Sequence, residues 1–507
     1  MIFQRIIHHK NKYSMRENFV QQQKIGVAPI SKVKITLKSR DELPAVLIGL
    51  QYIFITPELN KEVFKILNKA VGAKVKRKGR KGMSLWEILV LAVVRNSLDT
   101  NYDRLHDLAN YHILLRKIMG VQHYLGEDDS TQEYGLQTIK DNVKLLTADL
   151  IDEINLVVIK AGHSIAKKKE DEKLNISVDT YAFETNIHFP TDLGLLWDSV
   201  RKTIILTSRL SEEYKIKGWR KERFWLRKLK GAFRLSGYVK KSGGKNKEVR
   251  LKTVVASYLA LSNTVLFKTL QTIEELKGKK ETGVKLIAKL SEVIYYKDML
   301  EKHIDLVERR LIKDETILAS EKLMSIFESH TEWLQKGKSG RKKVEFGHNL
   351  LIASDQYKFI IYHKVIEKTS DIDLTIETID AVYEIFTGLI YSMSFDKGFS
   401  SKKVKEALLG TEKLEKLILP KRGKLNKQEK IEENEKEFKK LRNKHSRVES
   451  DINRLEHNGL NTCPDKGLPN FKRYASLGVL SYNLHNLGKI LQKQKIKEGK
   501  IKILKRA

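Results

Sequence analysis

The chain has 507 residues, 41% of them hydrophobic, which is enough for about two to four folded domains and argues against a disordered polybasic protein. Its 96 Lys and Arg residues against 63 Asp and Glu residues give a formal net charge of +33, which favours a polyanionic partner such as nucleic acid. Cys463 is the only cysteine, which excludes a disulfide framework and a cysteine-based zinc site, and the longest apolar run, 88–94, is far shorter than the ~20 residues of a membrane span.

Residues 1–80 form a basic N-terminal region that ends in a linker. Apolar residues at helical spacing predict one helix in it, over 58–71. The run 74–82 consists mostly of Lys, Arg and Gly, which predicts a flexible connector. Its composition is consistent both with a contact to DNA phosphates and with a merely solvated linker.

Residues 81–165 are predicted to be a helical DNA-binding domain. Ser84 followed by Glu87 is a capping-box pattern, and it starts an apolar helix that reaches Leu98. A long amphipathic helix over 136–161 completes the region, because its apolar residues recur on one stripe.

Two shorter helices are predicted between these, over 103–109 and 111–119. Short helices in this order are compatible with a helix-turn-helix-like DNA-binding unit, in which Arg116 and Lys117 would contact DNA. An ordinary small helical bundle gives the same sequence pattern, so both interpretations stay open.

The strand-like run 176–178 leads directly into Asp179. A strand that ends by presenting a carboxylate is a rigid support for a metal ion or an acid–base group. Many strands also end in Asp because the residue suits a turn, so this signal gains meaning only from acids elsewhere in the chain.

Residues 201–335 read as a basic, mainly helical insertion. Within it, the segment 217–228 interleaves basic and aromatic residues, a mixture that suits phosphate contact and base stacking. The alternative is a basic helix that buries its aromatic side chains in a core.

Residues 340–495 are predicted to be the second part of an α/β domain. The hydrophobic period changes from helical to alternating at Val344, which predicts a hairpin whose turn contains Asp355. A later buried strand ends at Asp396, and Gly388 closes the helix before it. The predicted elements are strands 344–354, 359–365, 389–395 and 417–419 and helices 374–387 and 402–409.

The order of elements is strand, long insertion, hairpin, helix, strand, helix, strand, helix. Without the insertion, this is the mixed α/β layout of an RNase H-like domain, with residues 170–200 as its first part and 340–495 as its second. The first and fourth strands are neighbours in that layout, so Asp179 and Asp396 are expected to lie side by side.

A helix predicted over 435–457 offers a third acid. Val448 belongs to its packing face, whereas Glu449 lies on a different stripe with Arg442 and Asn453. Those two neighbours would steady Glu449 or touch phosphate. A solvated glutamate on a charged helix is the alternative interpretation.

Taken together, these segments resemble bacterial insertion-sequence transposases of the DDE type, in a loosely classified group related to the large DDE families. The resemblance spans roughly residues 80–495. It is carried by MSLWEIL at 83–89, YDRL at 102–105, DT at 179–180, ETNIHFPTD at 184–192, LLWD at 195–198, VEFGH at 344–348, DKGF at 396–399, LPKRGKLN at 419–426, KHSRVESDIN at 444–453, LEHNGL at 455–460, RYASLG at 473–478 and YNLH at 482–485.

The resemblance implies that Asp179, Asp396 and Glu449 hold two Mg²⁺ ions, with Mn²⁺ as a substitute, for cleavage of the element ends and strand transfer. The residues expected to position substrate or the catalytic acids are Glu184, His188, Asp192, Arg442, His445 and Asn453. The residues expected to contact DNA are Arg116, Lys117, Trp219, Arg220, Arg223, Trp225, Arg227, Lys421 and Arg422.

The expected partners are double-stranded DNA, as terminal repeats and target, and a second copy of the chain in a homodimer on DNA. The expected location is the cytoplasm of a bacterium or archaeon, close to the nucleoid, without membrane contact, and residues 496–507 are a basic tail. Two departures from the family pattern are Lys397, where Arg is more usual, and the insertion, which follows the first strand. Two other functions remain open: an RNase H-like nuclease that does not join strands, and a non-catalytic DNA-binding protein.

Overall fold

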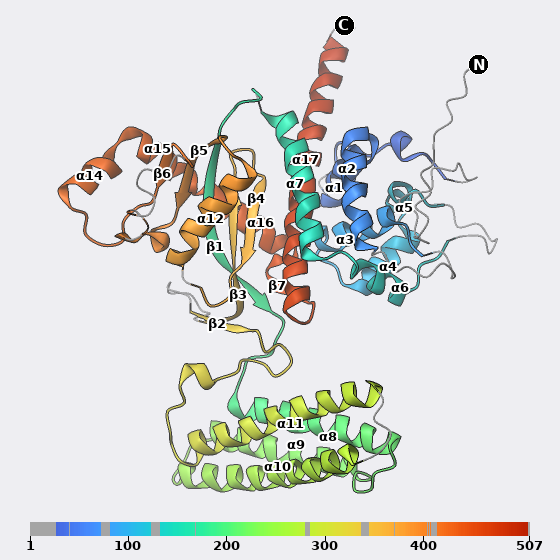
Figure 1. Ribbon diagram of the computed structural model, residues 1–507, viewed down its shortest axis with the longest axis vertical. Helices are drawn as coiled ribbons and strands as arrows, with labels where there is room; N and C mark the ends of the chain where they lie inside the picture. The colour runs from blue at the N-terminus through green and yellow to red at the C-terminus, as the bar shows by residue number, and fades with distance from the viewer. Residues whose placement is uncertain are drawn as a thin grey trace. The chain divides into compact units, whose positions relative to one another are not determined.

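The computed structural model describes residues 27–39, 41–71, 82–122, 132–167, 169–278, 284–335, 344–369, 371–402, 404, 406 and 413–504. Its contacts divide the chain into two compact units, unit 1 (Met1–Asn186 and Leu334–Ala507) and unit 2 (Ile187–Trp333), each of which is treated by itself (Figure 1). The predicted linker at 74–81 and most of the predicted helix at 402–409 lie outside the described residues.

Unit 1 contains a mixed, open β-sheet. The strands of this sheet are β1 (Leu174–Thr185), β2 (Glu332–Gln335), β3 (Val344–Ser354), β4 (Ile360–Val365), β5 (Ile390–Phe395), β6 (Lys416–Ile418) and β7 (Thr462–Cys463). The boundary between the two units, after Trp333, falls within β2. The order is β2-β3-β1-β5-β6, with β4 paired to β3 and β7 paired to β1. β3 is antiparallel to both β1 and β4, whereas β5 is parallel to both β1 and β6. The predicted hairpin and the predicted neighbourhood of the first and fourth strands are therefore confirmed.

Helices account for most of the rest of unit 1. They are α1 (Glu42–Ile55), α2 (Pro57–Leu67), α3 (Leu85–Ser97), α4 (Tyr102–Tyr111), α5 (Ile113–Met119), α6 (Leu136–Val143), α7 (Ala148–Ala166), α12 (Asp371–Ile385), α14 (Lys427–Asn434), α15 (Lys436–His445), α16 (Arg447–Leu455) and α17 (Leu468–Leu504). The predicted cap of α3 is present, because the Ser84 hydroxyl accepts a hydrogen bond from the Glu87 N–H.

Two of the long helices predicted from periodicity are each interrupted. The helix predicted over 136–161 is α6 and α7, and the Thr147 side chain caps the start of α7. The helix predicted over 435–457 is α15 and α16, which meet at Ser446, followed by a wide turn in which Gly459 has φ +89°. A continuous amphipathic stripe does not reveal such a break, because the stripe can continue across a short change of direction.

One hydrophobic core connects α1, α3, α7, α17 and one face of the sheet. The helices of residues 81–165 therefore share their core with the rest of unit 1 and do not form a separate compact unit. α17 is long enough to pack against α1, α3 and α7, and it includes residues 496–504 of the predicted tail (Figure 1).

α1 and α17 approach closely at two glycines. A Cβ on Gly488 would lie 1.8 Å from the backbone oxygen of Ala45, and one on Gly49 would lie 2.5 Å from that of Leu484. Both obstacles are backbone atoms, so a methyl group can be accommodated only if the helices separate. Real Cβ atoms do not approach backbone oxygens this closely, so glycine is required at this crossing.

We expect Gly488→Ala to lower the free energy of unfolding by about 1–3 kcal/mol through overpacking. Gly237→Ala is the matched control, because this glycine lies inside a helix of unit 2 with no atom within 4 Å of the added methyl group. There the change should raise stability by about 0.5–1 kcal/mol. Urea unfolding of each full-length variant measures both effects, and equal effects of the two changes would contradict the close crossing.

Unit 2 is a bundle of four helices, α8 (Asp192–Glu213), α9 (Glu222–Lys241), α10 (Lys247–Lys277) and α11 (Val284–Leu311), packed around apolar cores (Figure 1). It begins earlier than the predicted insertion at 201, because α8 starts at Asp192 and the Thr191 side chain caps it. Among the described helices, α10 alone is long and apolar enough to cross a membrane by length and composition, and a single such helix is only a weak indication.

Candidate active site where the pairing of two parallel strands ends

Asp179 and Asp396 follow a matched pair of residues on neighbouring strands. The parallel register of β1 and β5 places Val178 opposite Phe395 as its last pair. Asp179 follows Val178 and Asp396 follows Phe395 in the sequence, and adjacent strands are about 5 Å apart. Asp396 is exposed and directly follows the end of β5, whereas Asp179 is half-buried in the middle of β1, where it is paired with Ile352 of β3. The predicted end of the first strand at Asp179 is therefore wrong, because β1 continues to Thr185 after its pairing with β5 stops.

Both carboxylates belong to the face of the sheet that α15 and α16 cover. Side chains two residues apart on a strand share a face, so Asp179 lies on the same face as Ser177, and Asp396 on the same face as Ser394. The two serine hydroxyls are 3.2 Å apart, and Ser394 Oγ is 3.1 Å from Nδ1 of His445, the last residue of α15.

His445 lies in the surroundings of Asp396 and Glu449. Burial lowers the pKa of its imidazole below the ordinary value, and the charges of Asp396 and then Glu449 act in the opposite direction. Sequence reasoning gave His445 a positioning role but missed Ser177 and Ser394, whose small hydroxyls give no signal without the pairing register.

Glu449 is an exposed residue in the first turn of α16. Its neighbour Val448 is fully buried with Phe183 and Leu350 of the sheet, which fixes α16 on this face. The three acids come from separate elements, β1, the residue after β5, and α16, and α16 packs on the face of the sheet to which Asp179 belongs.

The oxygen donors of this face suit a hard cation such as Mg²⁺. In the part of the chain that is described, no group of three or more His, Cys, Asp or Glu side chains has the spacing of a complete metal cluster. Mg²⁺ is commonly held by only one or two carboxylates, with water and substrate phosphate as the remaining ligands. Asp179 and Asp396, which each follow the last pair of β1 and β5, meet that requirement, so these two residues fit the ion.

The other residues of unit 1 that were predicted to position substrate or the catalytic acids differ in their location and contacts. Glu184 lies on β1 five residues beyond Asp179, an odd separation that places it on the opposite face of the sheet. Arg442 is paired with Glu433 at 3.4 Å, and Asn453 is exposed on α16.

His188 and Asp192 belong to unit 2. His188 Nε2 lies 3.2 Å from a carboxylate oxygen of Asp198, and Arg310 donates to Asp192 at 2.7 Å. These contacts hold the start of α8 and its partner α11. They are structural contacts inside unit 2, and Asp198 is a buried acid that sequence reasoning did not single out.

Arg116 is buried, which is at odds with its predicted role as a DNA contact. Its side chain is only 1% exposed, and its guanidinium donates to the backbone oxygens of Gln122, Ala109 and Gln132. A guanidinium bound by three carbonyl groups holds the loops around α5 together and has no surface to offer a phosphate.

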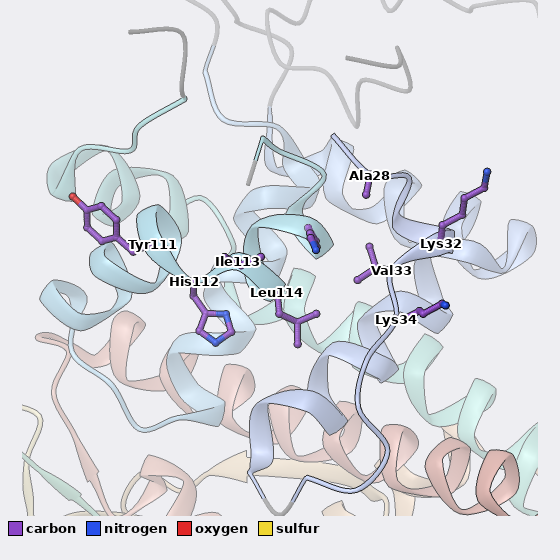
Figure 2. A pocket seen from close by; sticks show the side chains of 9 residues that line it. Ala28, Lys32, Val33, Lys34, Tyr111, His112, Ile113 and Leu114 are labelled. Carbon is purple, nitrogen blue, oxygen red and sulfur yellow. The ribbon is translucent and has the colours of Figure 1, made fainter. Parts of the chain in front are cut away.

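Lys117 lies on an open pocket of about 650 Å³ between η1 (Ile30–Lys32) and the α4–α5 junction (Figure 2). Lys32 and Lys34 also line this pocket, and so do Tyr111 and Ile113, which are 60% and 57% exposed. Three cations beside exposed apolar side chains make this surface a candidate DNA contact. Of the remaining predicted cations in unit 1, Lys421 is paired with Glu429 and Arg422 is exposed.

In unit 2 the burial of Trp219 contradicts its predicted contact with DNA, whereas the contacts predicted for Trp225 and for the basic residues stay predictions. Trp219 is 4% exposed, and its indole N–H donates to the Thr272 hydroxyl at 2.8 Å, so it is a core residue. Trp225 is half-buried against the same core. Phe224, which is 52% exposed, is the accessible aromatic side chain of this segment.

The outer face of α9 carries a row of unpaired cations. Arg223, Arg227, Lys230 and Arg234 recur at helical spacing and are all exposed. No ion pair is formed by any of these four with the described residues, whereas many cations of the neighbouring helices are paired, for example Lys289 with Glu213. The positive charge of unit 2 is thus concentrated on α9.

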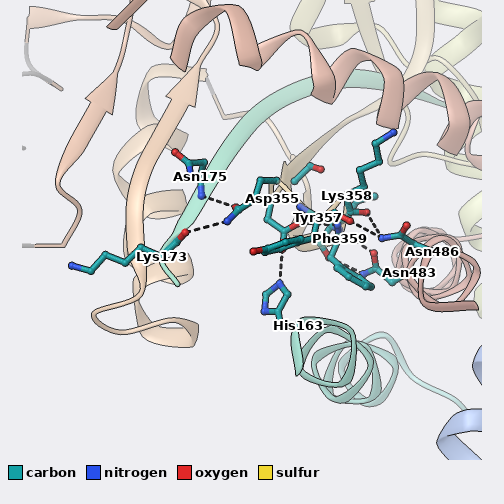
Figure 3. Close-up of polar contacts among 12 residues, drawn as sticks. His163, Lys173, Asn175, Asp355, Tyr357, Lys358, Phe359, Asn483 and Asn486 are labelled. Atoms are coloured by element: carbon teal, nitrogen blue, oxygen red, sulfur yellow. Dashed lines mark hydrogen bonds and ion pairs between the residues drawn. The ribbon is translucent and has the colours of Figure 1, made fainter. Parts of the chain in front are cut away.

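The hairpin turn between β3 and β4 is anchored by a buried carboxylate. Asp355 accepts hydrogen bonds from the N–H groups of Tyr357 and Phe359, which confirms its predicted turn role, and it also lies 2.5 Å from His163 Nε2 on α7 (Figure 3). The side chain of the next residue, Gln356, accepts from the N–H of Asn175 at the start of β1. This network holds β1 in register with the hairpin and so supports the strand that carries Asp179.

No protein-family model, curated protein or solved structure matches this chain.

Proposed function

We propose that this chain is a DNA transposase of the DDE type that cuts the ends of a mobile element and joins them to target DNA. The observation that carries the proposal is the placement of Asp179 and Asp396 directly after a matched pair on two parallel strands, under the helices that bear His445 and Glu449. The unpaired cations of α9 and the net charge of +33 support DNA as the substrate.

The strand order supports an RNase H-like fold for unit 1 within this proposal. An antiparallel hairpin lies on one side of the first strand, and two parallel strands lie on the other. Unit 2 is then an insertion in the sequence between the first strand and the hairpin, and it carries a basic surface of its own.

Asp179, Asp396 and Glu449 would hold the Mg²⁺ ions, which supply activation of the attacking oxygen and stabilisation of the leaving oxygen in phosphoryl transfer. The chain's own contribution is positioning. The β1–β5 register fixes the two aspartates side by side, and the packing of Val448 fixes the helix of Glu449. Ser394 orients the His445 ring at the base of the same face.

We expect the α9 cations to contribute directly to DNA affinity. The triple variant Arg227→Gln, Lys230→Gln, Arg234→Gln should reduce the slope of log K against log salt concentration by about 2–3, at roughly 0.9 for each lost phosphate contact. The matched control removes three paired cations of α11, Lys285, Lys289 and Lys297, and should change the slope by less than 1. Fluorescence anisotropy with duplex DNA measures both, and equal slopes for the two triples would contradict a DNA-binding role of this face.

A strand-transfer assay distinguishes the proposal from the other functions. Labelled duplexes ending in the sequences that flank the coding region are incubated with the protein, Mg²⁺ and a plasmid target. Covalent joining of the labelled 3′ ends to the plasmid supports a transposase. Cleavage without joining indicates a nuclease, and binding without either reaction indicates a non-catalytic DNA-binding protein.

A further inference from the structure

The turn between α8 and α9 encloses a second pocket, of about 660 Å³, within unit 2. Four cationic side chains line it against two acidic ones, Glu212 and Glu222, so the lining carries a net charge of +2. The four cations are Lys217, Arg220, Lys221 and Arg223. All four are exposed, and none forms an ion pair with the residues that the structure describes.

The wall of this pocket also contains an unsatisfied hydroxyl group. Ser211, in the last turn of α8, is 1% exposed, and its Oγ has no hydrogen-bond partner among the described residues. A buried hydroxyl without a partner carries a desolvation cost, so a ligand oxygen that accepts from it would recover that cost. The neighbouring Ser208 adds a further hydroxyl to the lining.

The backbone and a fifth cation complete the surroundings. Gly218 has φ +111°, a conformation that L side chains rarely adopt, and the Lys268 ammonium lies 3.7 Å from the position of a Cβ on this residue. The same ammonium is 5.5 Å from the centre of the Trp219 ring, which closes the turn from inside. Cations on several sides of one hydroxyl-bearing pocket form a surface suited to a tetrahedral oxyanion.

We propose that this pocket binds a phosphate group, with the Ser211 hydroxyl and the Arg220 guanidinium as donors. The volume exceeds that of a single phosphate and leaves room for the adjoining sugars of a DNA strand. The inference rests on the proposed function in one respect only, namely that the bound phosphate group is a phosphodiester of DNA. Phosphate recognition itself follows from the pocket.

The test uses full-length protein and two probes, inorganic phosphate by calorimetry at constant ionic strength and duplex DNA by anisotropy. We expect Ser211→Ala and Arg220→Gln each to weaken phosphate binding about tenfold, whereas Lys240→Gln, at the far end of α9, leaves it unchanged. Ser211→Ala removes an unpartnered hydroxyl, so its fold should be unaffected, and circular dichroism checks this.

The outcomes separate this inference from the proposed function. If inorganic phosphate does not bind but both pocket variants weaken DNA binding relative to Lys240→Gln, the pocket takes a DNA phosphodiester only. The inference is overturned if phosphate binds equally well to the parent and to both pocket variants. It is also overturned if the two substitutions change neither phosphate binding nor DNA binding. Mg²⁺-dependent DNA cleavage is scored separately. If the parent protein does not cleave DNA, the proposed function is overturned, whereas the inference of a phosphate-binding pocket is unaffected.

Discussion

Asp179→Asn and Asp396→Asn should each reduce DNA cleavage by at least about a thousandfold while DNA affinity stays within about twofold of the parent. An amide oxygen is a neutral and weaker ligand for Mg²⁺ than a carboxylate, and several kcal/mol of transition-state stabilisation correspond to such a factor. Because the pairing of β1 with β5 ends at Val178 and Phe395, both substitutions lie just beyond it and should leave its register unchanged. Glu449→Gln should have an effect of the same kind.

Matched controls are provided by acids of the same type elsewhere. Asp171→Asn changes an exposed aspartate shortly before β1, and Glu432→Gln changes an exposed glutamate on α14. Both should cleave DNA as the parent does. Single-turnover cleavage with a linear duplex, together with anisotropy for affinity, separates the chemical step from binding. Full activity of Asp179→Asn or of Asp396→Asn would remove that aspartate from the site.

Asp465→Ala should cause the largest loss of stability among single substitutions in unit 1, about 3–5 kcal/mol. Arg95 donates to both oxygens of this carboxylate, at 2.7 and 3.1 Å, and Arg473 donates at 2.9 Å. The side chains of Arg95 and Arg473 are only 2% and 6% exposed, so removal of the carboxylate leaves two buried guanidinium groups facing each other. The ring of Tyr102, 4.0 Å from Arg95, compensates only in part.

The same cluster predicts a pH dependence. Burial alone would raise the pKa of Asp465, but hydrogen bonds and charge from Arg95 and then Arg473 outweigh it and hold the pKa below the ordinary value. A lowered folded-state pKa means that the carboxylate contributes stability above its unfolded value of about 3.9, and that this contribution is lost as the pH falls through the lower folded value. The parent should therefore lose more stability than Asp465→Ala between neutral pH and pH 3.

Urea unfolding at a series of pH values measures both effects. Glu153→Ala is the control, because its ion pair with Lys69 is exposed and should be worth at most about 1 kcal/mol. An equal cost for Asp465→Ala and Glu153→Ala would show that the cluster does not hold α3 to the C-terminal part of unit 1.

The sequence predicted much of the sheet because its signals there are local. The bounds of β3 agree with the alternating run 344–354. Gly388 has φ +73° in the turn before β5, but α12 ends at Ile385, so the prediction that this glycine closes the helix directly after residue 387 was wrong. The neighbourhood of Asp179 and Asp396 followed from the element order. The interruption of the helix at Ser446 was missed, because the apolar positions of α15 and α16 continue one pattern.

The predictions that were corrected concern residue types with two common environments. Arg116 and Trp219 read as DNA contacts because both residue types are typical of nucleic-acid surfaces, yet both are buried and hydrogen-bonded. Arg223 and Arg227 were also predicted to contact DNA, and they are exposed. Only the three-dimensional packing distinguishes them from the buried Arg116 and Trp219. Ser177 and Ser394 could not be found from the sequence, since their contact depends on the register of two distant strands.

The most direct test of the central claim is cleavage of a supercoiled plasmid that carries the coding region with its flanking sequences. The parent protein is incubated with the plasmid in Mg²⁺ and, in parallel, in EDTA. The account predicts nicked or linear products with 3′-hydroxyl ends at the element boundaries in Mg²⁺, and none in EDTA. Products that form equally in EDTA, or binding with no Mg²⁺-dependent cleavage, would contradict a phosphoryl-transfer site at Asp179, Asp396 and Glu449.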